Sequence, residues 1–276
     1  MAILRRVPFG AAIGLLVTVT MVLAAILAPW VAPYPGSQVL GGVWEPASSQ
    51  FLLGTDNLGR DLLSRLIYGG RTTIFIAFMA TALAFILGSV LGFTAAVFGG
   101  WVDQVMSRLV DLLMSIPTLI FALVILSVLP STIPILILVM GILDSTRVYR
   151  LSRAVAVDIN VMDFVEAAKL RGEGRGWIIF REILPNALSP LVAELGLRFI
   201  FAVLFLSALS FLGLGVQPPH ADWGGMVREN REGIVFGIAA ALIPAGAIAA
   251  LAISVNLVAD WVLRRTSDLK GGRGNA

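Results

Sequence analysis

Six stretches of mostly apolar residues recur along this 276-residue chain, and they limit the folds that it can adopt. A helix needs about 20 apolar residues to cross a bilayer. The stretches cover residues 10–31, 72–98, 105–129, 133–151, 188–216 and 234–263. Only 13% of the residues are charged, against about 25% in soluble domains. We therefore predict an all-α polytopic membrane protein with six transmembrane helices.

Polar insertions divide the predicted spans into three parts. Two insertions are substantial, at residues 33–71 and 154–186. The parts are residues 1–71, the first span plus an outer segment; residues 72–263, a core of five spans that contains the 154–186 loop; and residues 264–276, a tail.

The first apolar stretch follows Arg5 and Arg6, so it could be a signal peptide. Its only candidate cleavage site with small residues, at 25–28, is followed at once by Pro29, which disfavours cleavage by a signal peptidase. We therefore expect an uncleaved first span.

The distribution of Lys and Arg predicts the orientation, because these residues are enriched in cytoplasmic segments. With the N-terminus inside, the inside segments hold Arg5, Arg6, Arg108, Arg147, Arg150, Arg153, Lys169, Arg171, Arg175, Arg181, Arg264, Arg265, Lys270 and Arg273. The outside segments hold Arg60, Arg65, Arg71, Arg228 and Arg231, partly balanced by acidic residues. Both termini and the 154–186 loop are thus expected in the cytoplasm, and the 33–71 segment outside.

Residues 54–71 of the outer segment have the pattern of an amphipathic helix. Thr55 and Asp56 are favourable cap residues at its start. Leucines at 58, 62 and 66 then fall on one face, while Asp61 and Arg65 fall on another. We expect a helix that lies on the membrane or leads into the second span.

Residues 166–185 form a helix-favouring polar segment that does not fit a bilayer. Its seven charged residues are Glu166, Lys169, Arg171, Glu173, Arg175, Arg181 and Glu182. Burying them in lipid would cost on the order of 20 kcal/mol, at about 2.5–3.5 kcal/mol each. The segment is therefore either a solvated loop whose charges set the topology, or a lever through which a cytoplasmic partner moves the spans.

The local chemistry of this segment suits a lever. Ala167 and Ala168 give a helix with a small face that another surface can approach closely. Gly172 permits a sharp turn after that helix. Residues 178–180 supply an apolar patch, and Pro185 suits the first turn of the next span.

The sequence lacks the residues that several kinds of catalytic and binding site require. The chain has no Cys and a single His, His220, so thiolate and ordinary zinc sites are not expected. No phosphate-binding Gly-rich loop of the Gly-x-x-x-x-Gly-Lys type occurs. The net charge of +3 lies beside apolar spans rather than in a nucleic-acid patch. We predict no enzyme activity, no metal, no cofactor bound by this chain and no nucleic-acid partner.

Ionisable residues inside predicted spans are candidates for function. Asp144 and Arg147 either pair on one face of the fourth span, or Arg147 reaches toward the inner interface. Glu194 and Arg198 are four residues apart and could satisfy each other, contact a second subunit or contact a solute. Asn256 could bond across the helix bundle.

The polar segment resembles the cytoplasmic loop of the membrane subunits of bacterial ABC importers. The matching residues are Glu166, Ala167, Ala168 and Gly172, followed by Ile-Leu-Pro-Asn at 183–186. Three further stretches are similar to the dipeptide/oligopeptide/nickel branch, in particular the shorter of its two permeases. They are Gly-Thr-Asp-Asn-Leu-Gly-Arg-Asp at 54–61, Ser-Phe-Leu-Gly-Leu-Gly-Val-Gln-Pro-Pro at 210–219 with Trp-Gly at 223–224, and Asn-Leu-Val-Ala-Asp at 256–260.

The resemblance implies a fold, partners and roles. It implies a type I importer permease with a cytoplasmic coupling helix, which pairs with a second homologous permease, two cytoplasmic ATPases that bind ATP and Mg²⁺, and an external solute-binding protein. The residues expected to contact an ATPase are Glu166, Ala167, Ala168, Gly172, Ile178, Ile179, Phe180, Arg181, Leu184 and Pro185. Those expected to meet the binding protein are Asp56, Arg60, Asp61, Arg65, Gln217 and Trp223.

The sequence leaves alternatives open for the transported solute and for the energy source. The resemblance favours di- or oligopeptides, while similar permeases carry nickel complexes, opines or oligosaccharides. A secondary transporter driven by an ion gradient is the alternative from another class, and it would show inverted repeats. No convincing repeat relates the two halves of this sequence.

Overall fold

The computed structural model describes residues 8–271, with side chains described to residue 263. Arg5, Arg6 and the side chains of the predicted tail, 264–276, lie outside this description. The main helices are α1 (Phe9–Ile26), α2 (Ala28–Val31), α3 (Leu62–Phe98), α4 (Gly100–Ser115), α5 (Thr118–Val128), α6 (Ile133–Asn160), α7 (Asp163–Leu170), α8 (Arg175–Trp177), α9 (Leu184–Phe211), α10 (Trp223–Asn230) and α11 (Leu242–Gly271). A π-helical segment, η2 (Ile178–Ile183), joins α8 to α9, and two 3₁₀ segments, η3 (Arg231–Phe236) and η4 (Ala239–Ala241), join α10 to α11.

The predicted all-α class is confirmed, while the structure supports a coarser count of spans than six. Four helical stretches are long and apolar enough to cross a membrane: Phe9–Ile26, Leu62–Phe98, Arg175–Phe211 and Ala239–Leu263. A fifth is possible if α4 and α5 together make one span. Helix α6 does not qualify by composition, because Asp144, Arg147, Arg150 and Arg153 all lie on it.

The third predicted span, 105–129, is not one straight helix. Helices α4 and α5 meet at an angle of 84°. Pro117 stands at the break, and Ile116 before it is extended, with ψ of 130°. A proline disfavours the helical conformation in the residue before it and has no N–H to donate, so the helix ends here although the apolar pattern continues.

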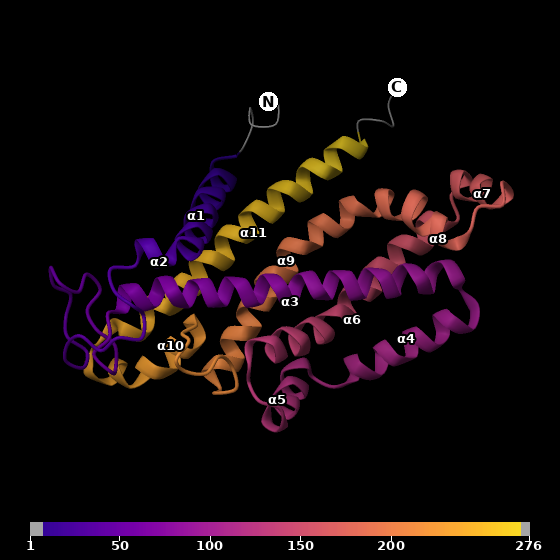
Figure 1. Ribbon diagram of the computed structural model, residues 1–276. Helices are drawn as coiled ribbons and strands as arrows, with labels where there is room; N and C mark the ends of the chain where they lie inside the picture. The colour runs from indigo at the N-terminus through magenta and orange to yellow at the C-terminus, as the bar shows by residue number, and fades with distance from the viewer. Residues whose placement is uncertain (1–7, 272–276) are drawn as a thin grey trace.

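Helix α3 runs along the whole molecule and packs side by side with α6 (Figure 1). The two helices approach closely where α3 carries Gly88. A Cβ atom at this position would lie 2.6 Å from Cβ of Val148 and 2.7 Å from the carbonyl oxygen of Ser145. Small residues allow such contact between membrane helices, where van der Waals packing drives association.

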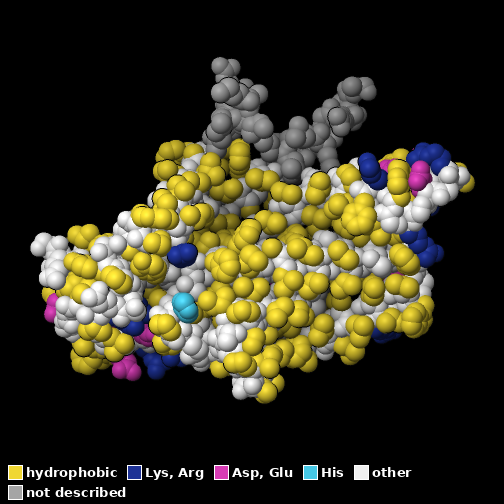
Figure 2. All heavy atoms as spheres, viewed as in Figure 1, with side chains coloured by type: hydrophobic (Ala, Val, Ile, Leu, Met, Phe, Trp, Pro, Cys, Tyr) yellow, Lys and Arg dark blue, Asp and Glu magenta, His cyan; other side chains and the backbone are white. Residues whose placement is uncertain are grey.

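The two polar insertions lie at opposite ends of the molecule (Figure 1). One end holds the loops before α3 together with α10, and the other holds α7 and α8. Between them, the face shown in Figure 2 is dominated by apolar side chains, with charged side chains gathered toward the two ends. This distribution suits a protein whose middle contacts lipid.

The helix predicted within residues 54–71 begins later than expected. Helix α3 starts at Leu62, and its cap is Asp61, whose carboxylate accepts from the N–H and the hydroxyl of Ser64 at 2.8 and 2.6 Å. The predicted caps were wrong because Asp56 closes a turn instead, accepting from the N–H groups of Leu58 and Arg60. Of the two arrangements predicted for this helix, the second is present, because the helix is continuous with the second span and ends at Phe98.

The other predicted spans shift at their ends. Helix α1 ends at Ile26, and the short α2 completes the first stretch. Helix α6 begins at Ile133 as predicted but continues to Asn160. The sixth span starts later than expected, because two 3₁₀ segments, η3 at residues 231–236 and η4 at residues 239–241, come before α11.

Candidate functional site

Helix α7 carries the Glu-Ala-Ala residues at one end of the molecule and has two distinct faces. Val165 and Ala168 are fully buried against the chain's own helices. Glu166 and Ala167 are exposed, and Leu170 is 85% exposed. The outer face of α7 is therefore open to solvent in this chain.

The turn after α7 has the conformation that its glycine allows. Gly172 has a φ of 83°, a left-handed conformation that side chains other than glycine rarely adopt. The N–H groups of Gly172 and Glu173 close the helix end by donating to the carbonyls of Lys169 and Ala168. The Lys169 ammonium also donates to the carbonyl of Asn160 at 2.9 Å, which ties α7 to the end of α6.

The apolar residues after this turn face mostly inward. Ile178 is buried and Ile179 is half-buried, and both pack within the chain. Of the three residues predicted as an outward apolar patch, only Phe180 projects, with 66% exposure. This part of the prediction is corrected, because Ile178 supports the segment from inside. Arg181 is exposed, as the lever interpretation requires.

The start of α9 and the end of α3 hold this region in place. Leu184 is half-buried at the first position of α9, and Pro185 follows in its first turn. The guanidinium of Arg175 lies 4.5 Å from the ring centroid of Phe98, a cation–π contact.

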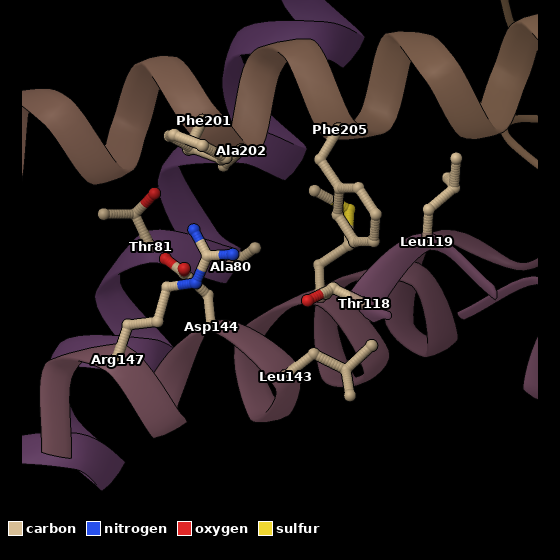
Figure 3. A pocket seen from close by; sticks show the side chains of 11 residues that line it. Ala80, Thr81, Thr118, Leu119, Leu143, Asp144, Arg147, Phe201, Ala202 and Phe205 are labelled. Carbon is tan, nitrogen blue, oxygen red and sulfur yellow. The ribbon is translucent and has the colours of Figure 1, made fainter. Parts of the chain in front are cut away.

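A cavity of about 200 Å³ lies between α3, α5, α6 and α9 (Figure 3). Its lining residues are Ala80, Thr81, Thr118, Leu119, Met140, Leu143, Asp144, Arg147, Phe201, Ala202 and Phe205. Two of the predicted intramembrane charges therefore face one space.

Of the four ionisable residues predicted inside spans, Arg198 pairs with both Glu194 and Asp144, and Arg147 pairs with neither. Arg198 donates to Glu194 at 2.7 Å, the spacing-of-four contact, and also to Asp144 at 3.3 Å. Arg147 does not pair with Asp144, since its guanidinium lies 5.0 Å from the ring centroid of Phe201. Asn256 is exposed on α11, so within this chain it faces outward instead of bonding across the bundle.

At the opposite end, four charged side chains form a network that we call the outer ion cluster: Asp56, Arg60, Arg65 and Glu229. Oδ2 of Asp56 accepts from Nε of Arg60 at 2.7 Å and from Nη1 of Arg65 at 2.6 Å. Oε2 of Glu229 accepts from the same two arginines at 2.9 and 2.7 Å. Asp56 is 0% and Arg65 is 2% exposed. The cluster joins the loop before α3 to α10.

Helix α10 is fixed further by neutral contacts. Trp223 is buried, and its indole N–H donates to the carbonyl of Leu66 at 2.8 Å. Oδ1 of Asn230 accepts from the N–H of Asn57 at 2.9 Å and from the indole of Trp44 at 3.2 Å. The outer loops and α10 therefore form one packed unit.

Most of the residues predicted to contact the binding protein are buried within this chain. Asp56, Asp61, Arg65 and Trp223 are buried, so in this conformation they shape the outer surface instead of touching a partner. Gln217 is exposed and donates to the carbonyls of Gly213 and Gly215. A contact between this end and a binding protein stays a prediction.

Two carboxyl groups at this end are perturbed by burial. Desolvation raises the pKa of Asp222 to about 6, while hydrogen bonds from the N–H groups of Gly225 and Gly224 oppose the shift. Desolvation also raises the pKa of Glu229, against the lowering effect of Arg60. Asp222 is the N-cap of α10.

Sequence reasoning missed Glu229, Asn230 and Phe201 as partners of the predicted residues. Glu229 lies 164 positions from Arg65, and Asn230 lies 173 from Asn57. A pairing this distant leaves no spacing signal in a single sequence.

Comparison with known proteins identifies the class. Residues 84–268 match the model of a family described as binding-protein-dependent transport system inner membrane component. A putative peptide transport system permease protein of Brucella suis is 36% identical over 94% of this chain and 86% of its own length. The dipeptide transport system permease protein DppC of Haemophilus influenzae is 34% identical over 91% of this chain and 88% of its own. The di/tripeptide transport system permease protein DppC of Pseudomonas aeruginosa is 36% identical over 91% and 85%.

The long apolar helices with charged ends define a multi-pass membrane protein. This chain belongs to the family of binding-protein-dependent transport system inner membrane components. It is therefore a permease of the inner membrane and not an enzyme.

Proposed function

We propose that this chain is one of two pore-forming permease subunits of an ATP-driven ABC importer for di- or oligopeptides. The relatives above are named for peptide, dipeptide or di/tripeptide transport, and they align with nearly the whole chain. The observation that carries the mechanism is α7, a short helix at one end of the molecule with a buried inner face and an exposed outer face.

The proposal gives each partner a place on this chain. A cytoplasmic ATPase would cover the exposed face of α7 around Glu166, Ala167 and Leu170, and would bind the ATP and Mg²⁺ itself. Buried Val165 and Ala168 would pass a displacement of α7 to the chain's own bundle. A second, homologous permease would complete the pore, a second ATPase would serve that permease, and an external binding protein would meet the end that carries α10.

The six-span topology, with both termini in the cytoplasm, belongs to this proposal. Helix α6 would cross the membrane despite its charges, because charged side chains in spans face the bundle interior or reach the interface. Arg150 and Arg153 would lie near the inner interface, where Arg153 pairs with Asp103 and Arg150 with Asp111.

Two substitutions on the exposed face of α7, one that reverses a charge and one that introduces a charge, test the coupling. Glu166→Lys and Leu170→Glu are made in the complete complex, with Asp158→Lys as a matched reversal at an exposed position of α6. We expect both α7 variants to insert and pair with the second permease, but to abolish ATP-driven uptake and to lose most of the ATPase on purification. The control should keep both.

For Leu170→Glu the physical basis is the loss of an exposed apolar contact at the centre of an interface, where truncations cost about 2 kcal/mol or more. For Glu166→Lys it is the reversal of a charge that faces the same surface. Normal uptake and full retention of the ATPase by well-inserted Glu166→Lys and Leu170→Glu would contradict the proposed contact.

A further inference from the structure

The cavity between α3, α5, α6 and α9 has a polar end and an apolar end (Figure 3). Thr81, Asp144 and Arg147 gather at one end. Leu119 and Phe205 lie at the other. Ligand sites in proteins combine an apolar lining with a few convergent polar groups in this way.

Two groups at the polar end lack the partner that their chemistry calls for. Oδ1 of Asp144 accepts from Arg198, while its Oδ2 is buried and has no hydrogen-bond partner among the described residues. Arg147 makes no ion pair within the described part of the chain, and its guanidinium lies over the ring of Phe201. A buried polar atom without a partner is costly, and native structures seldom leave one unmet.

The four charged side chains around the cavity sum to zero, but Arg147 is not paired with either carboxylate. Arg198 is shared between Glu194 and Asp144, so these three side chains carry one net negative charge. Arg147, one turn from Asp144 on the same helix, carries one positive charge. The site therefore offers one acceptor for a cation and one donor for an anion, side by side on α6.

We propose that this cavity binds the two charged groups of a small zwitterionic solute. An ammonium group of the solute donates to Oδ2 of Asp144, and a carboxylate accepts from the guanidinium of Arg147. An apolar side chain of the solute occupies the end lined by Leu119 and Phe205. Taking the solute to be a short peptide rests on the function proposed above.

The size of the cavity fits a partial site. Complete sites for drug-sized ligands measure about 300–1,000 Å³. This cavity of about 200 Å³ holds one or two residues of a peptide, and Phe201 and Leu119 at its edge are themselves partly exposed. A longer peptide could place only one of its two charged termini in a cavity of this size.

The absence of Cys from the sequence provides a direct test. Thr118→Cys places a single thiol of this chain in the cavity wall and replaces the hydroxyl and methyl groups of the threonine by one sulfur. Its rate of labelling by a methanethiosulfonate reagent is measured on this chain in the complex, in nanodiscs without the binding protein. The probes are alanyl-leucine, N-acetyl-alanyl-leucine and alanyl-leucinamide, with and without a non-hydrolysable ATP analogue.

Alanyl-leucine should slow the labelling, and it should do so at lower concentrations than either blocked analogue. Asp144→Asn should weaken protection by alanyl-leucine about ten- to a hundredfold, the value of a charged hydrogen bond, and should remove its advantage over the acetylated probe. Arg147→Gln should remove the advantage over the amidated probe. Glu194→Gln removes a partner of Arg198, and Glu194 does not line the cavity, so this variant should leave the ratio between probes unchanged.

Two results would overturn the inference. One is labelling that no probe slows in either nucleotide state, which would mean that water alone fills the cavity. The other is equal protection by all three probes with no effect of Asp144→Asn or Arg147→Gln. ATP-driven uptake of alanyl-leucine by the complex with its binding protein is measured separately, so failure of the proposed transport function is distinguishable from failure of the site.

Discussion

The outer ion cluster allows a quantitative prediction for Asp56→Asn. The carboxylate of Asp56 accepts four hydrogen bonds: two N–H groups donate to Oδ1, and the side chains of Arg60 and Arg65 donate to Oδ2. An asparagine keeps the Oδ1 acceptor. At Oδ2 it places an NH₂ donor against two guanidinium donors, and it leaves the cluster with one uncompensated positive charge.

The magnitude follows from the two charge-assisted bonds that are lost. Such bonds contribute about 1.5–3 kcal/mol each, and breaking a buried ion pair costs about 3–5 kcal/mol. Glu229 still accepts from both arginines, so we expect the lower end of the range, about 3 kcal/mol. Because 1.4 kcal/mol is a factor of ten, local opening should become more frequent by about a hundredfold.

Hydrogen exchange with mass spectrometry measures this opening on the complex in nanodiscs. Peptides from residues 51–66 and 222–232 should exchange faster together, because the cluster joins these segments. Asp111→Asn is the control, since its pair with Arg150 is 54–55% exposed and should contribute less than about 1 kcal/mol. If Asp56→Asn changed exchange in both segments by less than about threefold, the reasoning about this cluster would be wrong.

Two further predictions concern α10 and the helix packing. Burial raises the pKa of Asp222 from 3.8 to about 6, so its contribution to stability is present in full below pH 4 and is lost as the pH rises through 6. Exchange within α10, corrected for intrinsic rates, should therefore be slower at pH 4.5 than at 7.5 by up to about 25-fold, which corresponds to about 2 kcal/mol. Asp222→Asn should remove this part of the pH dependence and leave the part that the raised pKa of Glu229 contributes. Gly88→Leu should lower the thermal stability by about 1–3 kcal/mol, because its side chain would collide with Val148, whereas Gly246→Leu meets open space and should not. A variant of Gly88 with unchanged melting behaviour would argue against close α3–α6 packing.

Sequence patterns located the apolar helices well where a strong local signal marks their ends. Helix α3 ends at Phe98 before a glycine pair, and α6 begins at Ile133 between two prolines, both as predicted. The break at Pro117 was missed because the residues next to it are apolar on both sides, Leu-Leu-Met at 112–114 and Leu-Ile-Phe at 119–121, and the charged residues of α4 lie further back. The onset of α3 was missed because Asp56 and Asp61 are equally good caps by type, whereas in the structure Asp56 closes a turn with Leu58 and Arg60 and also pairs with Arg65.

The same distinction applies to the candidate sites. The Glu194–Arg198 contact follows from a spacing of four on one helix and is present. The partner of Asp144 was not predictable, because Arg198 lies 54 positions away and reaches it only through the packing of α6 on α9. Which face of α7 is exposed depends on Val165 and Ala168 fitting into the bundle, and the Glu-Ala-Ala pattern alone does not specify it.

Helix α3 connects the three regions described above. Its N-terminal turn carries Arg65 of the outer ion cluster, its middle lines the cavity with Thr81, and its last residue, Phe98, contacts Arg175 beyond α7. With 37 residues at about 1.5 Å each, it spans about 55 Å. It contains no proline, and the Gly69–Gly70 pair near its outer end lies directly against Trp223. Glycine pairs are where long helices kink, so the packing of α10 there opposes bending. We therefore expect α3 to transmit a displacement from the α7 end as a unit, with α10 moving along with it.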